Sequence, residues 1–209
     1  MSAKELLAAL IVVLILGMSA AAQSKNELAG TIGRTFIPDQ TPPGTNFFDN
    51  TIHQGKGTTF EVDYARHIWG NGNFLQLSLE VPVLVNPDED LNYGINTIPE
   101  SYSSIFVTPG ARLNAFADTA ISPWVSFGGG FGHFNESDTL VFGGKNPGPT
   151  GTTTGVFEYG GGLDVRVWHS IGVRLEIRNF SSGLPQLNVA TSNSRQRNLY
   201  VGGGVVWHF

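Results

Sequence analysis

The chain lacks cysteine entirely, and it holds only 2 methionines among its 209 residues. Without cysteine, an exported protein of this length is not held together by disulfide bonds. Residues that favour helices are sparse, whereas glycine, with 27 residues, and phenylalanine, with 14, are abundant. This balance is typical of an all-β chain in which backbones approach one another closely.

Runs of basic residues are also absent, and the formal net charge is −5. A nucleic-acid-binding domain needs clustered positive charge, so the composition argues against a nucleic-acid partner. The 5 histidines do not have the close spacing of a metal site. The glycine runs at 128–130 and 160–162 are followed by no helical pattern, so they are not phosphate-binding loops. We therefore expect neither a metal nor a cofactor.

A long apolar run occurs once, from Leu6 to Met18. Lys4 precedes it, three alanines at 20–22 follow it, and it is too short for the roughly 20 residues that a membrane-spanning helix needs. We predict that residues 1–22 are a secretory signal peptide, removed between Ala22 and Gln23. With no second run of this kind, any insertion of residues 23–209 into a membrane must use strands.

What the chain does have is apolar and polar alternation with a period of two, which predicts strands with unlike faces. In the clearest case, leucine or valine occupies every odd position from 75 to 85, while 76, 78 and 80 are polar. Pro109 interrupts another strand, which predicts a bulge there or a shorter strand. The predicted strands are 26–36, 57–69, 73–85, 102–114, 124–134, 155–168, 171–180 and 197–209.

The connections between these strands alternate in length along the chain. The long ones are 37–56, 86–101, 135–154 and 181–196, rich in Gly, Pro, Asn and Thr. Membrane barrels have short periplasmic turns and long outer loops, and an even strand number places both barrel ends on the short-turn side. We predict an all-β fold, a closed eight-stranded antiparallel up-and-down transmembrane β-barrel formed by residues 23–209.

The last predicted strand, RNLYVGGGVVWHF, ends on an aromatic residue. It resembles the C-terminal strand of bacterial outer-membrane barrels, which typically finishes on Phe and is read by the barrel assembly machinery. The resemblance implies an assembly signal that comprises Tyr200, Val205, Trp207 and Phe209.

Alternation alone leaves open which face points outward, because a soluble barrel would place its apolar face inside. The charged face favours the membrane case, since it is rich in Gly and Ser, which leave room for long side chains in a narrow interior. Charges removed from water must pair, and arginine is the usual partner of a carboxylate there. We predict a nearly balanced charge network in the lumen: Glu61, Asp63, Glu80, Arg112, Glu158, Asp164, Arg166, Arg174, Glu176 and Arg178.

Aromatic residues gather near the predicted strand ends, where the interfacial girdles of a membrane barrel lie. We predict that these residues face the membrane interfaces: Trp69, Tyr102, Trp124, Phe134, Trp168, Trp207 and Phe209.

Residues 26–209 resemble the small eight-stranded outer-membrane β-barrels, the OmpA/OmpX-like transmembrane domain. The resemblance implies a monomeric protein of the Gram-negative cell outer membrane, in contact with its lipids and lipopolysaccharide. That family includes adhesins, structural proteins and a few lipid-modifying enzymes. No peptidoglycan-binding domain follows Phe209, so we expect no role in anchoring the cell wall.

One enzyme of this barrel size, a lipid A deacylase, carries a His-x-Ser motif on its penultimate strand. Here Ser181 matches the nucleophile, but Asn179 stands where the base should be, and an amide nitrogen cannot take the serine proton. We therefore expect no catalysis, and a structural or surface-interaction role. The alternatives are a narrow porin-like pore gated by the charged lumen, a lipid A-active hydrolase, and a secreted soluble barrel that binds a small apolar ligand.

Overall fold

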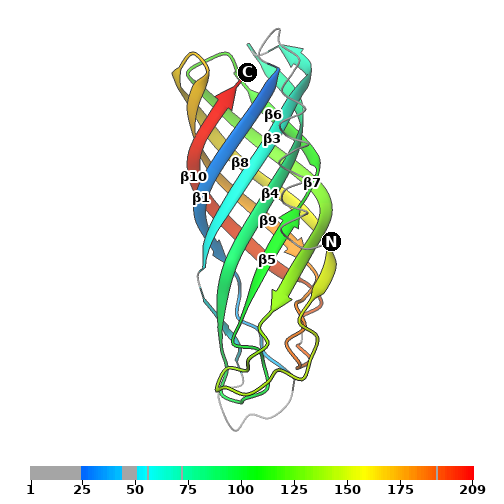
Figure 1. The fold of residues 1–209 in the computed structure, drawn as a ribbon. Coiled ribbons are helices and arrows are strands. Elements are labelled where there is room, and N and C mark those ends of the chain that lie inside the picture. Colours follow the sequence, from blue (N-terminus) through cyan, green and yellow to red (C-terminus); the bar gives the residue numbers. More distant parts are fainter. Residues whose placement is uncertain (1–24, 44–50, 56, 72, 192) are drawn as a thin grey trace.

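A computed structural model describes residues 25–43, 51–55, 57–71, 73–191 and 193–209. The predicted signal peptide lies outside these described residues. All regular structure in the described part is β, and it contains no helix long and apolar enough to cross a membrane. Figure 1 shows the strands, which are β1 (Asn26–Phe36), β2 (His53–Gln54), β3 (Thr58–Asn71), β4 (Leu75–Asn92), β5 (Ser101–Val107), β6 (Gly110–Ala115), β7 (Ile121–Glu136), β8 (Thr152–Trp168), β9 (Ile171–Ser182) and β10 (Gln196–His208).

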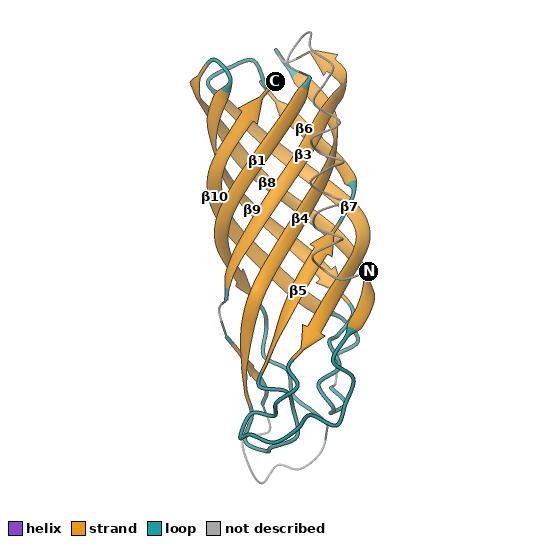
Figure 2. Ribbon diagram, in the orientation of Figure 1, coloured by secondary structure: helices purple, strands orange, loops and turns teal. Residues whose placement is uncertain are grey.

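The strands form one closed antiparallel ring (Figures 1 and 2). Neighbours in the chain are neighbours in the wall, and β10 returns to pair with β1 from Glu27↔His208 to Phe36↔Leu199. β5 and β6 are successive stretches of one wall strand, because both pair with β4 and β7. β2 pairs only with the far end of β4. The predicted closed eight-stranded barrel is confirmed, and closure leaves no sheet edge unpaired.

The break between β5 and β6 falls at Thr108 and Pro109, where the sequence predicted an irregularity. Pro109 has no N–H to donate, and neither does Pro82 on the neighbouring β4. The ladder still continues across the break, since the Thr108 N–H donates to the Pro82 carbonyl at 3.3 Å. On the other side, the Gly129 N–H donates to the Pro109 carbonyl at 3.1 Å.

Short turns gather at one end of the barrel and long loops at the other, as Figure 2 shows. The predicted loop 86–101 is wrong in its first half, because Asn86–Asn92 continues β4 as strand. This extension is held by pairing with β5, as in Glu89↔Tyr102, and with β2, as in His53↔Asn92. β7 and β8 likewise continue past their predicted ends, to Glu136 and from Thr152. The wall therefore projects beyond the last pair of the β3–β4 ladder, Phe60↔Val85.

The outer surface of the wall is apolar, whereas polar and charged side chains line the middle of the interior. Phe127, Leu175 and Val125 are more than half exposed, whereas the residues that alternate with them, Ser126, Arg174 and Glu176, are buried. This is the reverse of a soluble barrel, in which the apolar face would fill the interior. The prediction that the apolar faces point outward is confirmed by this burial pattern.

Candidate functional site

Three arginines lie at the centre of the barrel, and none of them is more than 1% exposed. Arg112 comes from β6, and Arg174 and Arg178 come from β9. Arg174 donates from Nε to Asp164 at 2.8 Å and from its terminal nitrogen to Asp63 at 3.1 Å. Asp63 also lies 3.2 Å from Arg112 and 3.6 Å from Arg178, so this one carboxylate contacts all three guanidinium groups.

The guanidinium group of Arg178 contacts the four predicted glutamates of the lumen. The contacts are Glu80 at 2.9 Å, Glu61 at 3.1 Å, and Glu158 and Glu176 at 3.3 Å each. Its partners come from β3, β4, β8 and β9, so the side chain crosses the lumen and joins opposite walls. Removing one partner from a buried group of ion pairs is strongly destabilising, because the other charged side chains stay buried without a counter-charge.

The network has a member that the sequence analysis missed, and another predicted member lies elsewhere. Glu27 on β1 contacts Arg112 at 2.7 Å and also Arg174. Arg166, by contrast, is exposed at the short-turn end, where it donates to the carbonyls of Ala117 and Asp118. Arg166 still pairs regularly with Gly172 on β9, so it keeps the parity of the inward positions, and it is exposed because it lies at the rim of the lumen.

These two changes alter the charge balance of the lumen. Instead of six acids and four bases, the charged layer holds seven carboxyl groups and three guanidinium groups among the described residues, so the predicted near balance is wrong. The seven acids are Glu27, Glu61, Asp63, Glu80, Glu158, Asp164 and Glu176.

Trp124 lies inside the network rather than in an interfacial girdle, so its predicted position is wrong. It is 3% exposed, and the guanidinium carbons of Arg178, Arg174 and Arg112 lie 4.8, 5.1 and 5.6 Å from its ring. Its Nε1–H donates to Asp164 at 3.2 Å. Gly162, its partner across β7 and β8, leaves the space for the indole, since a Cβ there would meet the ring. Stacked arginines and a desolvated indole attract one another through the ring quadrupole.

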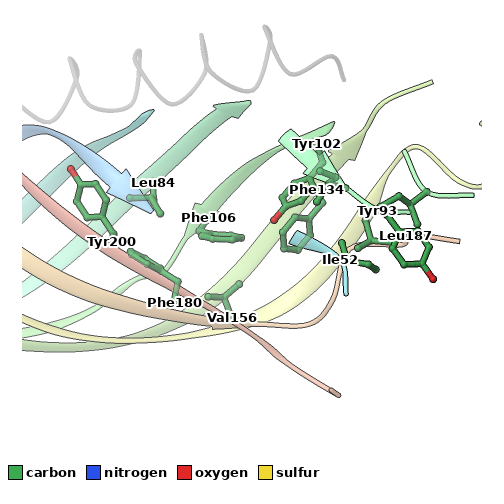
Figure 3. Packing of buried hydrophobic residues seen from close by; sticks show 12 residues of the cluster. Ile52, Leu84, Tyr93, Tyr102, Phe106, Phe134, Val156, Phe180, Leu187 and Tyr200 are labelled. Carbon is green, nitrogen blue, oxygen red and sulfur yellow. The ribbon is translucent and has the colours of Figure 1, made fainter. Parts of the chain in front are cut away.

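On the long-loop side of the charged layer, the interior is filled by packed aromatic rings (Figure 3). Phe106 lies 5.6 Å from Phe134 and 5.7 Å from Phe180, measured between ring centroids. Tyr102 lies 5.7 Å from Phe134, so both of these predicted girdle residues are in fact inside the barrel. Residues from the loops continue the same cluster outward: Ile52, Tyr93, Ile98 and Leu187.

Other predicted girdle residues do point outward, and they lie near the short-turn end. Trp69 is 65% exposed and Trp168 is 70% exposed, while Trp207 packs on Phe209 with ring centroids 4.7 Å apart. Among the predicted assembly-signal residues, Val205 and Trp207 share this outer face. Tyr200 is instead buried in the lumen, 2.8 Å from the hydroxyl of Thr31. Recognition of these four residues during assembly stays a prediction.

A hollow of about 160 Å³ opens at the short-turn end. Glu27 and Asp164 line it, together with His169, His208 and Arg166. Among the described residues, no three His, Asp or Glu side chains are grouped so that they could hold a metal ion. The hollow reaches the charged layer, and the aromatic layer lies beyond that.

The serine that matched the deacylase nucleophile sits at the outer end of β9. Ser181 accepts a hydrogen bond from Arg195 Nε at 3.0 Å and pairs with Arg197 across the ladder. Asn179, which stands where a base would be needed, is buried, and its Oδ1 has no hydrogen-bond partner. Within the described ranges of the chain, the Ser181 hydroxyl contacts the Arg195 guanidinium group and has no hydrogen bond to a side chain that could take its proton.

No family model matches the chain, and no curated protein matches it. Among solved structures, Neisserial surface protein A (NspA) superposes with a TM-score of 0.54 at 9% identity, covering 90% of this chain and 100% of that one. The outer membrane protein OprG from Pseudomonas aeruginosa gives 0.48 at 9% identity, with coverages of 88% and 95%. Ail, the attachment invasion locus protein of Yersinia pestis, gives 0.43 at 11% identity, with coverages of 88% and 99%.

At such low identity, the likeness to NspA concerns the fold. Together with the closed antiparallel ring, it shows that the chain has the fold of the small eight-stranded outer-membrane β-barrels.

Proposed function

We propose that the protein is an integral barrel of the Gram-negative outer membrane, closed to ions and without catalytic activity, with a structural or surface-interaction role. It is exported by the segment 1–22 and inserted by the barrel assembly machinery, and it contacts the outer-membrane lipids as a monomer. The long loops face the cell exterior and carry any binding. The outward apolar wall and the buried charges support the location.

We propose a closed barrel because two successive layers of side chains fill the lumen. An ion crossing the barrel would have to pass the arginine–carboxylate layer and then the ring stack of Phe106, Phe134 and Phe180. The ring centroids of the stack lie 5.6 and 5.7 Å apart, and the buried polar side chains beside it, Gln196, Asn198 and Ser182, are hydrogen-bonded to one another. Eight-stranded barrels have an interior just wide enough for side chains to fill.

Conductance of the purified protein in a planar lipid bilayer tests this proposal. We expect no channel activity from the wild type, because the aromatic layer blocks the lumen. Replacing Phe106, Phe134 and Phe180 with alanine, combined with Arg178→Gln in the charged layer, should produce small conductance steps, because both layers that fill the lumen are then opened. A matched triple replacement on the outer wall, Phe127→Ala, Phe131→Ala and Phe157→Ala, should stay silent. Regular conductance steps from the wild type would contradict the proposed closed state.

The second candidate function is a narrow pore gated by the lumen charges. It is favoured by one observation: Arg112 and Arg174 share both Glu27 and Asp63, so each arginine has alternative partners at hand. A gate of this kind opens when such partners exchange. In the same recordings, the gate requires wild-type conductance that changes after Arg112→Gln and Arg174→Gln. Wild-type conductance that stays the same in both variants would eliminate it.

A further inference from the structure

A group of arginines lies on the outside of the barrel near its long-loop end. Arg34 is on β1, Arg197 is on β10, and Arg195 precedes β10; all three are exposed. In the described part of the chain, no carboxylate forms an ion pair with any of them. The nearby Asp39 is bound to His53 at 2.8 Å.

On the other side of this end most exposed charges are acidic, with Lys145 as an exception, which sets the arginine group apart. The exposed acids on the other side, from the end of β4 to the loop after β7, are Asp88, Asp90, Glu100 and Asp138. The chain as a whole has a net charge of −5, yet this side carries several arginines that form no ion pair within the residues that the structure describes. Such a local excess of positive charge attracts anions, so it indicates an anionic ligand.

Arg195 and Arg197 flank a hollow of about 210 Å³ that is also lined by Pro38, Gln40 and Asn193. Arg195 is held in place, because it donates from Nε to the Ser181 hydroxyl at 3.0 Å and from a terminal nitrogen to the Ser181 carbonyl at 2.6 Å. Two guanidinium groups with free donors at one hollow suit a phosphate group, which accepts several charge-assisted hydrogen bonds.

Two glutamines also line the hollow, and both are tied into the interior. Gln40 is 2% exposed, and its Nε2 donates to Gln196 Oε1 at 2.9 Å. Gln196 Nε2 in turn donates to Asn198 Oδ1 at 2.8 Å. The exposed charged donors at the hollow are therefore those of the two arginines.

On the short-turn side of the hollow, the outer surface of the wall is apolar. Leu199 follows Arg197 on the same face of β10 and pairs with Phe36, and Val201 and Ile177 continue the exposed apolar surface. A ligand held by its head group at the arginines would therefore have apolar wall alongside its tail. This placement favours a lipid of the surrounding leaflet over a free sugar phosphate.

We propose that Arg195 and Arg197 form a binding site for the phosphorylated sugar head group of lipopolysaccharide in the outer leaflet. The guanidinium groups bind a phosphate, and the acyl chains lie along β9, β10 and β1. This proposal rests on the proposed location in the outer membrane.

The test uses the full barrel, folded into phosphatidylcholine nanodiscs, and measures binding of purified lipopolysaccharide and of the same material after removal of its phosphates. The wild type should bind the phosphorylated form roughly tenfold more tightly, as charge-assisted contacts imply. The double variant Arg195→Gln, Arg197→Gln should lose this preference. Arg197→Gln alone should lose part of it, and this variant keeps the contacts between Arg195 and Ser181.

The matched control is Lys145→Gln, which removes one exposed charge at the same end but on the β7–β8 loop, and it should retain the full preference. An inserted wild-type barrel that binds both forms equally, or a double variant that keeps the preference, would overturn the site alone. A chain that fails to insert, seen before any ligand is added, would overturn the proposed location together with the site.

Discussion

At the scale of single residues, Arg178 makes the largest set of buried ionic contacts in the lumen. Four glutamates lie within 3.3 Å of its guanidinium group, and it also lies over the ring of Trp124. The free energy of this cluster depends on the cation, because the carboxylates repel one another without it. Arg178 is therefore the residue at which the charged layer is most sensitive to substitution.

We expect Arg178→Gln to lower the free energy of unfolding by about 3–5 kcal/mol, the usual cost of removing one partner from a buried ionic set. The measurement is the urea midpoint of the folded barrel in detergent. Arg166→Gln is the matched control, since Arg166 lies on the adjacent strand but is exposed, and it should change the midpoint little. Equal midpoints for the two variants would show that the lumen network does not stabilise the barrel.

Trp124 gives a second test at this scale. Trp124→Leu keeps an apolar side chain but removes the ring face from three guanidinium groups and the donor from Asp164. We expect a loss of about 2 kcal/mol or more, as for a desolvated cation–π contact. Trp69→Leu, on the exposed outer face, is the comparison, and it should cost less in the same urea titration. If Trp69→Leu lowered the urea midpoint more than Trp124→Leu does, the indole inside the lumen would not be the more stabilising of the two.

Alternation in the sequence predicted the interior positions of most of these residues. Arg166 keeps the parity of the inward positions, but it lies at the short-turn end of β8, and alternation does not show how far along the barrel a residue lies. For Trp124, the alternation is right, because Trp124 shares its parity with Ser126 and Gly128 on the Gly- and Ser-rich face that is predicted to be inside. The preference of aromatic residues for membrane interfaces pointed the other way, and no sequence signal shows that three arginines stack on one ring. Glu27 was missed because Gly and Thr dilute the pattern of β1.

At the scale of elements, the outer end of β4 contains a carboxyl group that forms no ion pair within the described part of the chain. Glu89 lies beyond the last β3–β4 pair, and its side chain is buried. Its Oε2 accepts hydrogen bonds from Asn86 and from the Gly57 N–H, while its Oε1 has no partner. Burial raises the pKa of Glu89 above its usual value, and the neighbouring Asp90 and Asp88 raise it further.

A raised carboxyl pKa in the folded state means that folding favours the protonated form. The stability of this segment is therefore greatest below the ordinary carboxyl pKa, and it falls as the pH rises through the raised value. We expect the amides of residues 86–92 to be better protected from hydrogen exchange at pH 5 than at pH 8, after correction for the intrinsic rate. Glu89→Gln should remove that difference, and Glu100→Gln, which is exposed, should keep it. A difference that persists in Glu89→Gln would assign the effect to another group.

The existence of every wall strand could be predicted, because each one carries a period-two pattern over most of its length. The strand ends were less predictable. Residues 86–92 read as loop because Asn, Pro and Asp dominate them, but pairing with β2 and β5 holds them as strand. Such cross-strand support is not visible in the local sequence.

At the scale of the whole molecule, barrel closure follows from properties that the sequence does show. The alternation of long and short connections predicts an up-and-down order, and a chain that ends on an amphipathic strand can pair that strand with its first. The filling of the lumen by aromatic rings was not predicted, since Tyr102, Phe134 and Trp124 were assigned to the outside. This filling changes the functional expectation from a charged lumen alone to two successive barriers.

The central claim is that the protein crosses a membrane as a closed barrel with its apolar face outward. Electrophoresis of the membrane fraction, with and without boiling in detergent, tests it most directly. We predict that the unheated protein stays with the membranes after a urea wash and migrates differently from the boiled protein, because the barrel remains folded in detergent. Identical migration of both samples, with release of the protein into the soluble fraction, would contradict the claim.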